Sequence, residues 1–381
     1  MPVRAVSATA PGWPPAPRQH YCAHSIDDPP DPAPRMRLEF EILDLKTREP
    51  FRIARRSDPH GRRNVWVRLI DDDGLEGWGE AAANAFYGET ADTVSAVLPR
   101  YGAALGAERE PFELDRIERG LIDEVGRNPA ARTAISAALH DLVGKRLDQP
   151  VWRIWGLDPA AAPRSSFTIG IGDAGATREK ARAAAHRPVL KVKVGRDDDE
   201  TRLRAIRDEA PDAVVYVDAN TAWTAKQALR RMPMLEELGV AFVEQPLHPD
   251  DHEGMRLLRR RARLPIIADE SCETAADIPR LLGTVDGINI KLAKAGSLRE
   301  AMRMVHVARA HGLLVMLGCM LQSTLGIAAA VQLAPLADYL DLDGALLLAD
   351  DPFDGPGMED DGSIAFNQEP GLGVRRAVEV G

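Results

Sequence analysis

Short, nearly continuous apolar segments alternate with amphipathic segments through the second half of this 381-residue chain. They read SSFTIGIG, VLKVKV, VVYVDAN, AFVEQP, IIADES, INIKLAK and LLVMLGC, with an eighth around ADYLDLDGALLL. Continuous apolar segments of this length are typical of strands buried on both faces, as in parallel sheets. Eight strand–helix steps in about 180 residues predict an α/β fold, a (β/α)8 barrel over residues 161–350, rather than an open doubly wound sheet.

The first part of the chain has a different pattern. Residues 36–82 alternate apolar and polar positions and contain the turn DDDG, which predicts antiparallel strands. Residues 90–157 repeat apolar positions at spacings of three and four, which predicts helices, and Asn128-Pro129 marks a helix start. We therefore expect an α+β capping domain over residues 36–160, completed by the Gly/Pro-rich tail 351–381.

Composition narrows the class of protein. Residues 1–35 hold nine of the 28 prolines and predict a disordered, Pro-rich extension. Lys+Arg 48 against Asp+Glu 58 gives a net charge of −10, which disfavours nucleic acid and anionic membranes as partners. Three cysteines make no disulfide framework, and no apolar segment approaches the ~20 residues that span a bilayer. We expect a cytoplasmic protein with a small-molecule partner; the oligomeric state stays open, with a homo-oligomer as one alternative.

Five chemically active residues end five consecutive apolar segments: Lys193, Asp218, Glu244, Asp269 and Lys291, at intervals of 25, 26, 25 and 22 residues. Catalytic groups of such barrels lie at the carboxyl ends of the strands. Strands 3, 4 and 5 are neighbours, so we expect the three carboxylates to converge. Strands 2 and 6 lie opposite each other in a ring of eight, so we expect the two lysines to face each other.

This set of residues suits proton transfer beside a metal ion. Carboxylate oxygens with no Cys or His nearby favour Mg²⁺, or Mn²⁺, over zinc. A substrate carboxylate on that metal would allow loss of the adjacent proton, because the metal neutralises the resulting enediolate. Two amines on opposite faces could remove the proton and return one from behind, which inverts the carbon.

The acting lysine needs a pKa below the usual ~10.4, and the metal and Lys191 would lower it. Lys191 is two positions from Lys193 on a strand, so both side chains should point into the barrel. Each residue alone also has a structural alternative: a carboxylate at a strand end can cap a helix, and a lysine there can be solvated. The order and register of all five together favour a functional site.

At these residues the chain resembles the enolase superfamily, in its muconate lactonizing enzyme subgroup. The resemblance covers about residues 37–355 and includes HDLVGKRLDQPVWRIWG, which is similar to the end of that family's capping domain. The matching barrel stretches, in family order, are Lys191-Val192-Lys193, Val217 to Asn220, Glu244-Gln245-Pro246, Asp269-Glu270-Ser271 and Lys291 to Gly296. The resemblance implies metal ligands at Asp218, Glu244 and Asp269, and acid/base lysines at Lys193 and Lys291. Lys294 also matches, and we interpret it as a helix-start residue.

Two features separate this chain from other branches of the family. The mandelate racemase subgroup has a His at the end of strand 7, whereas this chain has Gly318-Cys319-Met320 there. The family usually has a Glu shortly afterwards, where this chain has Gln322-Ser323, which puts an auxiliary carboxylate at this position in doubt.

The last strand indicates the substrate. Asp341 and Asp343 share one face and could bind an ammonium group, with a turn or helix cap as the alternative. The segment resembles that of the family's dipeptide epimerases, where it holds the free amino terminus. Arg56, which follows PFRIA, is placed like the arginine that meets the glutamate carboxylate in Ala-Glu epimerases; a solvated basic loop is the alternative. Thr168 and Lys191 complete the expected substrate-binding set, with a core role as the alternative for Thr168.

The predicted function is therefore that of a Mg²⁺-dependent dipeptide epimerase, an isomerase that inverts the α-carbon of the C-terminal residue of a dipeptide such as L-Ala-L/D-Glu. Lys193 and Lys291 would carry out the 1,1-proton transfer. The alternatives are an N-acylamino acid racemase, or an o-succinylbenzoate synthase or cycloisomerase on the same scaffold. A metal-binding barrel without turnover is the alternative outside enzymes.

Overall fold

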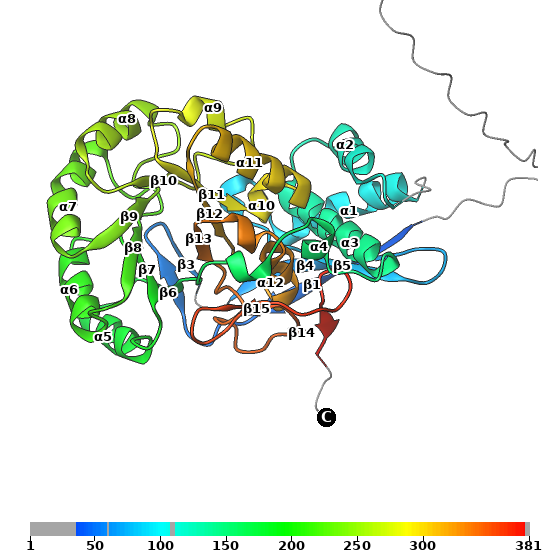
Figure 1. The fold of residues 1–381 in the computed structure, drawn as a ribbon, viewed down its shortest axis with the longest axis horizontal. Coiled ribbons are helices and arrows are strands. Elements are labelled where there is room, and N and C mark those ends of the chain that lie inside the picture. Colours follow the sequence, from blue (N-terminus) through cyan, green and yellow to red (C-terminus); the bar gives the residue numbers. More distant parts are fainter. Residues whose placement is uncertain (1–35, 59–60, 107–110, 378–381) are drawn as a thin grey trace, which may run out of the picture. The chain divides into compact units, whose positions relative to one another are not determined.

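A computed structural model of the chain describes residues 36–58, 61–106 and 111–377, with the backbone alone described at 56–58. The predicted disordered extension, residues 1–35, lies outside the described residues. Figure 1 shows a barrel, whose outer helices run from green to yellow, beside a smaller layer of strands and helices in blue and cyan.

The smaller part is an antiparallel sheet covered by helices. The sheet has the order β1-β4-β5, formed by β1 (Arg37–Leu45), β4 (Arg62–Ile70) and β5 (Glu76–Ala81). The helices are α1 (Ala91–Leu105), α2 (Leu114–Glu124), α3 (Pro129–Arg146) and the short α4 (Val151–Ile154), with 3-10 turns η1 (Ala85–Tyr87) and η2 (Pro159–Ala161). Helix α3 starts at Pro129, as predicted, because proline at the first helical position loses no hydrogen bond.

A β-hairpin that the sequence did not predict leaves this sheet. Strands β2 (Phe51–Ile53) and β3 (Arg56–Asp58) pair with each other and form a separate two-stranded sheet. The backbone N–H of Ile171 donates to the Arg52 carbonyl over 2.9 Å, so the hairpin is fastened at the end of the first barrel strand. This contact brings residues near position 55 to the mouth of the barrel.

The barrel consists of eight parallel strands in sequence order. The strands are β6 (Phe167–Ile169), β7 (Val189–Lys193), β8 (Val214–Asp218), β9 (Val240–Glu244), β10 (Ile266–Ala268), β11 (Gly287–Lys291), β12 (Leu314–Gly318) and β13 (Tyr339–Asp341). A parallel bridge between Ser165 and Leu340 joins the first strand to the last and closes the ring. The predicted barrel with an α+β capping layer is therefore confirmed.

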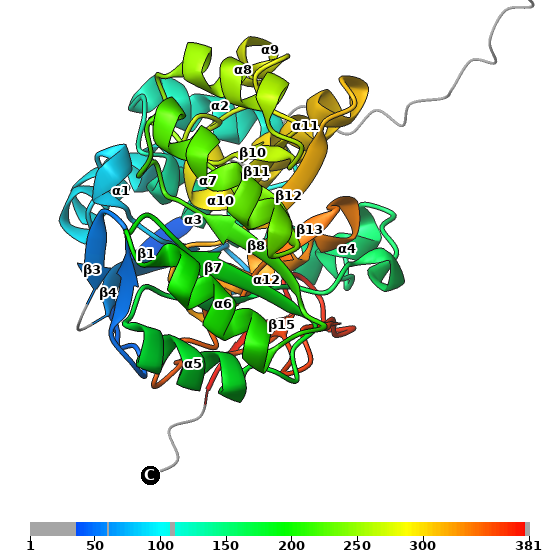
Figure 2. The same cartoon turned by 90° about the vertical axis from the view of Figure 1, so that its left-hand side faces the viewer.

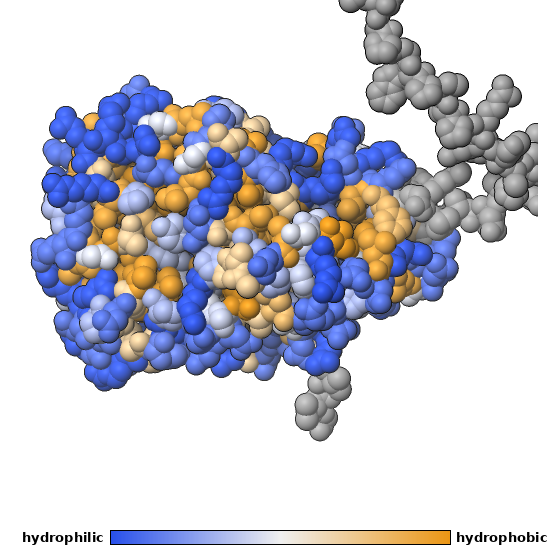
Figure 3. Space-filling view, viewed as in Figure 1, coloured by the Kyte–Doolittle hydropathy of each residue, from blue (hydrophilic) through white to orange (hydrophobic). Residues whose placement is uncertain are grey.

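Helices cover the outside of the barrel. They are α5 (Ala174–Ala183), α6 (Asp199–Glu209), α7 (Ala225–Glu237), α8 (His252–Arg261), α9 (Ile278–Leu281), α10 (Leu292–Ala295), α11 (Leu298–Ala310) and α12 (Thr324–Val331), with the turn η3 (Ala334–Leu336). Figure 2 shows α5, α6 and α7 in front of the strands. Hydrophilic residues dominate the outer rim over α5 to α8, and apolar residues show toward the centre of the view (Figure 3). Within the described residues, no helix has the length and apolar character needed to cross a membrane.

The eighth strand–helix step is where the sequence prediction is wrong. No helix follows β13 in the described part of the chain, although eight strand–helix steps were expected. Leu348 packs instead with Leu45 and Leu321, and the Ala349 N–H donates to the Lys46 carbonyl over 2.8 Å. Leu348 is thus buried against the capping layer, and the chain reaches it through a turn at residues 344–347.

The tail contacts the capping layer at several points. Phe353 packs edge-on against Trp78 with ring centroids 5.9 Å apart, and the Leu372 N–H donates to Asp141 on α3 over 2.8 Å. The tail strands are β14 (Phe353–Asp354), β15 (Gly357–Met358), β16 (Ile364–Ala365) and β17 (Arg375–Arg376). The tail therefore completes the capping layer, whereas the exact domain limits stay a prediction.

Candidate active site

Three carboxylates meet at the carboxyl ends of neighbouring strands. Asp218 ends β8, Glu244 ends β9 and Asp269 directly follows β10. One oxygen from each lies within 4.8 Å of the others, and all three residues are buried. Strands 3, 4 and 5 thus bring together the side chains that their order in the barrel predicts.

The donor atoms of this triad fit a hard divalent cation. They are all carboxylate oxygens, without a His or Cys among them, which suits Mg²⁺ better than zinc. Burial without a compensating positive charge would be unfavourable for three carboxylates, and lysine ammonium groups lie beside them. The site therefore has the chemistry to hold Mg²⁺, as the sequence predicted.

Lys193 and Lys291 flank the triad from opposite sides of the ring. Lys193 ends β7 and its Nζ lies 2.6 Å from Asp218, while Lys291 ends β11 and its Nζ lies 2.8 Å from Asp269. Burial favours a lower pKa for Lys291, but the charges of Asp269 and Glu244 outweigh it and hold the pKa above its usual value. The lowered lysine pKa expected from the sequence depends on the metal ion and stays a prediction.

Lys191 lies beneath the triad and is fully buried. It points into the barrel like Lys193, as their spacing of two predicts. Its Nζ contacts Glu244 over 2.7 Å and Asp341 over 2.6 Å. Burial acts to lower the pKa of Lys191, yet these carboxylates raise it well above the usual value. Lys191 is therefore a fixed positive charge that links the triad to the last strand.

Asp341 and Asp343 form the second acidic group. Asp341 ends β13 and accepts a hydrogen bond from Ser166 over 3.0 Å, and Asp343 accepts one from the Thr168 N–H over 2.6 Å. Burial acts to raise the pKa of Asp341, but Lys191 holds it below its usual value. Burial and the charge of Asp341 raise the pKa of Asp343 to about 7. The pair therefore lies where an ammonium group would add a favourable charge.

A cavity of about 80 Å³ connects these groups. Thr168, which belongs to the expected substrate-binding set, also lines it, together with Cys319. The lining residues come from the hairpin, the capping layer and the strand ends: Phe51, Ile53, Arg55, Arg62, Asn84, Thr168, Lys193, Asn220, Lys291, Cys319, Met320, Leu321, Asp341, Asp343, Gly344 and Leu347. The two predicted acid/base lysines, Lys193 and Lys291, and the two aspartates predicted to bind an ammonium group, Asp341 and Asp343, thus line one cavity.

Comparison with known families agrees with this geometry. Residues 38–156 match the N-terminal domain of mandelate racemase and muconate lactonizing enzyme, and residues 176–379 match the enolase C-terminal domain-like family. The chain belongs to the enolase superfamily. Within this superfamily, the chain belongs to the mandelate racemase/muconate lactonizing enzyme family, because both of its domains match.

Similar proteins in this family are named as epimerases of dipeptides. The L-Ala-D/L-Glu epimerase of Bacteroides thetaiotaomicron is 37% identical over 347 residues, covering 90% of this chain and 88% of the relative. The L-Lys-D/L-Arg epimerase of Methylococcus capsulatus is 38% identical over 356 residues, covering 88% of this chain and 99% of the relative. The structure of a dipeptide epimerase from Cytophaga hutchinsonii with Mg and D-Ala-L-Val has a TM-score of 0.86 and 26% identity, covering 91% of this chain and 97% of that chain.

Lys294 lies in the first turn of α10, where the sequence interpretation placed it, and its ammonium group makes further contacts. It is 1% exposed, and its Nζ contacts the Asp269 carboxylate over 2.6 Å and the carbonyls of Cys272 and Asn289 over 2.9 and 3.0 Å. Its position at the start of α10 agrees with the helix-start interpretation, and its ammonium group is in addition buried behind a predicted metal ligand. The spacing of three from Lys291 was the available signal, since both can face one side of a helical turn.

The hairpin places Arg55 at the site. Its Nη1 donates to Glu270 over 2.5 Å and to the Asn220 carbonyl over 3.0 Å, and its guanidinium lies 4.2 Å from the centre of the Phe86 ring. The contact between Arg55 and Glu270 was not predicted from the sequence, although Glu270 lies in a family motif. Arg56 begins β3, and its side chain lies outside the described part, so its predicted contact with a substrate stays a prediction.

Proposed function

We propose that this chain is a Mg²⁺-dependent dipeptide epimerase that inverts the α-carbon of the C-terminal residue. The observation that carries the proposal is the position of Lys193 and Lys291, which end strands four steps apart in a ring of eight and flank the carboxylate triad. Relatives over nearly the whole chain are named dipeptide epimerases, which supports the same reaction class.

In this proposal Asp218, Glu244 and Asp269 hold the metal. A bound Mg²⁺ would hold the substrate's C-terminal carboxylate and offset the negative charge that develops as the α-proton leaves. Lys193 and Lys291 stand on opposite faces of the α-carbon; the neutral one removes the proton and the charged one returns a proton from the other side. Lys191 stays protonated between the two acidic groups and fixes their positions.

A free amino terminus is the feature that separates this proposal from its alternatives. The buried carboxyl groups of Asp341 and Asp343 suit an ammonium group. An N-acylamino acid, an o-succinylbenzoate precursor or a muconate carries no ammonium group and would leave these carboxyl groups buried without that partner. The pair therefore favours dipeptides over the substrates of the alternative enzymes on this scaffold.

The identity of the dipeptide is the finer part of the proposal. The relatives named above act on, or are bound to, dipeptides with acidic, basic and small apolar C-terminal residues. Ala-Glu is the first candidate, because Arg56 follows the hairpin strand that reaches the site. Cytoplasmic location and the absence of nucleic-acid and membrane partners stay predictions from composition.

The test is a library of L,L-dipeptides incubated with the protein and Mg²⁺ in D2O and followed by mass and by chiral chromatography. We expect gain of one deuterium and inversion at the C-terminal residue alone. Lys193→Ala and Lys291→Ala should each abolish inversion, while the remaining lysine still exchanges the proton of one epimer. Lys226→Ala, at an exposed position on α7, is the matched control. Exchange with N-acylated amino acids but with no dipeptide would refute the proposal in favour of a racemase.

A further inference from the structure

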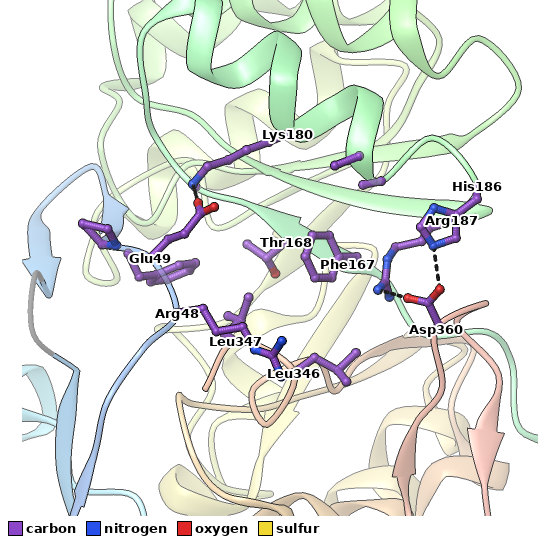
Figure 4. A pocket seen from close by; sticks show the side chains of 15 residues that line it. Arg48, Glu49, Phe167, Thr168, Lys180, His186, Arg187, Leu346, Leu347 and Asp360 are labelled. Atoms are coloured by element: carbon purple, nitrogen blue, oxygen red, sulfur yellow. Dashed lines mark hydrogen bonds and ion pairs between the residues drawn. The ribbon is translucent and has the colours of Figure 1, made fainter. Parts of the chain in front are cut away.

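Segments around the barrel are joined to one another in two ways. Near β6 they are joined by opposite charges: Lys180 pairs with Glu49 over 2.7 Å, and His186 lies 3.0 Å from Asp360 of the tail (Figure 4). The loops after β8, β9 and β10, which carry the three predicted metal ligands, are also joined by an uncharged residue, Gln245. An amide can fix a loop by hydrogen bonds without adding a charge beside the metal.

The side chain of Gln245 connects the loop after β9 to the loop after β10. Gln245 directly follows the predicted ligand Glu244 and is fully buried. Its Oε1 accepts hydrogen bonds from the backbone N–H groups of Asp269 over 2.9 Å and of Ser271 over 3.1 Å. Its Nε2 donates to the Leu247 carbonyl over 2.9 Å and to the Ser271 hydroxyl over 2.8 Å. All four hydrogen-bonding positions of the amide are therefore used, which fixes its orientation.

The backbone of Gln245 reaches the third loop. Its carbonyl accepts from the N–H of Thr221, in the loop after β8, over 2.9 Å, and its N–H donates to the Ile267 carbonyl of β10 over 2.9 Å. Gln245 has a φ of 33°, in the left-handed region that residues with a Cβ rarely adopt. Such a backbone persists only where surrounding contacts hold it, and such positions cluster at functional sites. One residue thus bridges all three ligand-bearing loops.

The two N–H groups bound by Gln245 fix the directions of the carboxylates between them. Asp269 turns one oxygen toward the triad, within 4.8 Å of oxygens of the other two ligands, whereas Glu270 accepts from Arg55 of the hairpin over 2.5 Å. Without the Gln245 amide, the N–H of Asp269 would be buried without its acceptor, which is unfavourable. The loop would then have to move to pair this group, and the Asp269 carboxylate would move with it.

We propose that Gln245 is a positioning residue that sets the spacing of the metal ligands and so makes the site select Mg²⁺ over larger cations such as Ca²⁺. Mg²⁺ needs near-octahedral geometry with oxygens at about 2.0–2.1 Å, whereas Ca²⁺ accepts flexible ligands at about 2.3–2.6 Å. Fixed loops suit the smaller ion, and loops that can move apart also suit the larger one. Gln245 acts through Glu244 and Asp269, and the inference rests on the metal site of the proposed function rather than on the dipeptide.

Calorimetric titration with Mg²⁺ and, separately, with Ca²⁺ tests this role, on full-length protein from which bound metal has been removed by dialysis against EDTA. Gln245→Met keeps the length of the side chain and removes all four hydrogen bonds of the amide. We expect it to weaken Mg²⁺ binding ~10–100-fold, as is typical for partners behind metal ligands, and Ca²⁺ binding by less. The preference for Mg²⁺ over Ca²⁺ should therefore fall.

Gln332→Met is the matched control, because Gln332 is a second buried glutamine with a similar set of bonds outside the catalytic site. Its Oε1 accepts from the Trp152 N–H over 3.0 Å, and its Nε2 donates to the carbonyls of Ala328 and Leu372 over 3.1 and 3.4 Å. Both methionine variants should lower Tm, since both leave buried backbone groups unpaired. Only Gln245→Met should change the ratio of the Mg²⁺ and Ca²⁺ dissociation constants, which a merely structural role would leave unchanged.

Gln245→Gly keeps the test decisive if the methionine variant does not fold. Glycine adopts a φ of 33° without strain and lacks the amide, so this variant should fold and show the same loss of preference for Mg²⁺. Equal weakening of Mg²⁺ and Ca²⁺ binding in the folded variant would overturn the proposal. Dissociation constants for both ions like those of Gln332→Met would overturn it as well, and so would a wild type that does not bind Mg²⁺.

The dipeptide found by the D2O screen separates this inference from the proposed function. We expect Gln245→Met to need more Mg²⁺ than wild type for half-maximal inversion, and Gln332→Met to need the same concentration as wild type. If no dipeptide turns over, the proposed function fails while the calorimetric ratio still decides the role of Gln245. If a dipeptide turns over and the ratio is unchanged, the proposed function stands and the inference fails.

Discussion

Replacing Lys294 by Met tests the inference that this buried ammonium group holds Asp269 in place. The substitution keeps most of the side-chain volume and removes the charge, which leaves the Asp269 carboxylate and the carbonyls of Cys272 and Asn289 without their shared donor. Removing one partner of a buried ion pair costs about 3–5 kcal/mol. At ~2–4 °C per kcal/mol for a large domain, we expect Tm to fall by about 10 °C.

Thermal unfolding followed by circular dichroism measures this change, and calorimetric titration with Mg²⁺ measures its effect at the triad. We expect weaker Mg²⁺ binding, because Asp269 loses one of the two cations that hold its carboxylate. Lys226→Met, on the exposed face of α7, should change stability by no more than ~0.5 kcal/mol. A Lys294→Met protein with the Tm and Mg²⁺ affinity of that control would refute the reasoning and leave Lys294 with its helix-start position alone.

Three further predictions concern charge and packing. The pKa of Asp343 is about 7, so kcat/KM for free-amine dipeptides should rise from about pH 6 to about pH 8 as this carboxyl ionises, and Asp343→Asn should remove that rise; a profile that keeps it contradicts the assignment. Burial lowers the pKa of His140 to about 4, below the ~6.5 of an unfolded chain, so its contribution is complete above about pH 6.5 and is lost toward pH 4, by up to ~3 kcal/mol. Urea unfolding at several pH values should show His140→Leu with a shallower acid loss than wild type. Gly79→Ala would place a Cβ 2.0 Å from the Ala134 carbonyl and should lower stability by ~1–3 kcal/mol, whereas Gly126→Ala, with open space around it, should not.

The barrel and its strand-end residues could be predicted because a parallel strand and its return helix occupy a nearly constant length of chain. That regularity placed Asp218, Glu244 and the residue after β10 at one edge before any contact was known. The same regularity failed after β13, where the segment around Leu348 is buried against Leu45 of the capping layer. An apolar segment predicts burial, but it does not predict which element of the structure packs against it.

The contacts of individual lysine and arginine side chains could not be predicted from the sequence for a related reason. Arg55 and Arg56 are adjacent, and composition alone cannot choose which of two neighbouring arginines reaches the site. Arg55 reaches Glu270 because the hairpin is fastened to the backbone at Ile171. Lys294 gains its partners only when the loop after β10 folds back over α10. Both roles depend on how loops approach the barrel, which periodicity does not describe.

Counting charge around the mouth connects the site to its proposed ligands. Five cations, Lys191, Lys193, Lys291, Lys294 and Arg55, stand among six carboxyl groups, those of Asp218, Glu244, Asp269, Glu270, Asp341 and Asp343. With all of these groups ionised the set carries one negative charge, and a divalent cation at the triad would make it one positive charge. A dipeptide zwitterion then meets an excess of positive charge at its carboxylate and the Asp341–Asp343 pair at its ammonium. The substrate carboxylate therefore balances the positive charge at the metal, and the substrate ammonium group balances the negative charge of Asp341 and Asp343. A substrate that lacks its carboxylate or its ammonium group leaves one of these buried charges unbalanced.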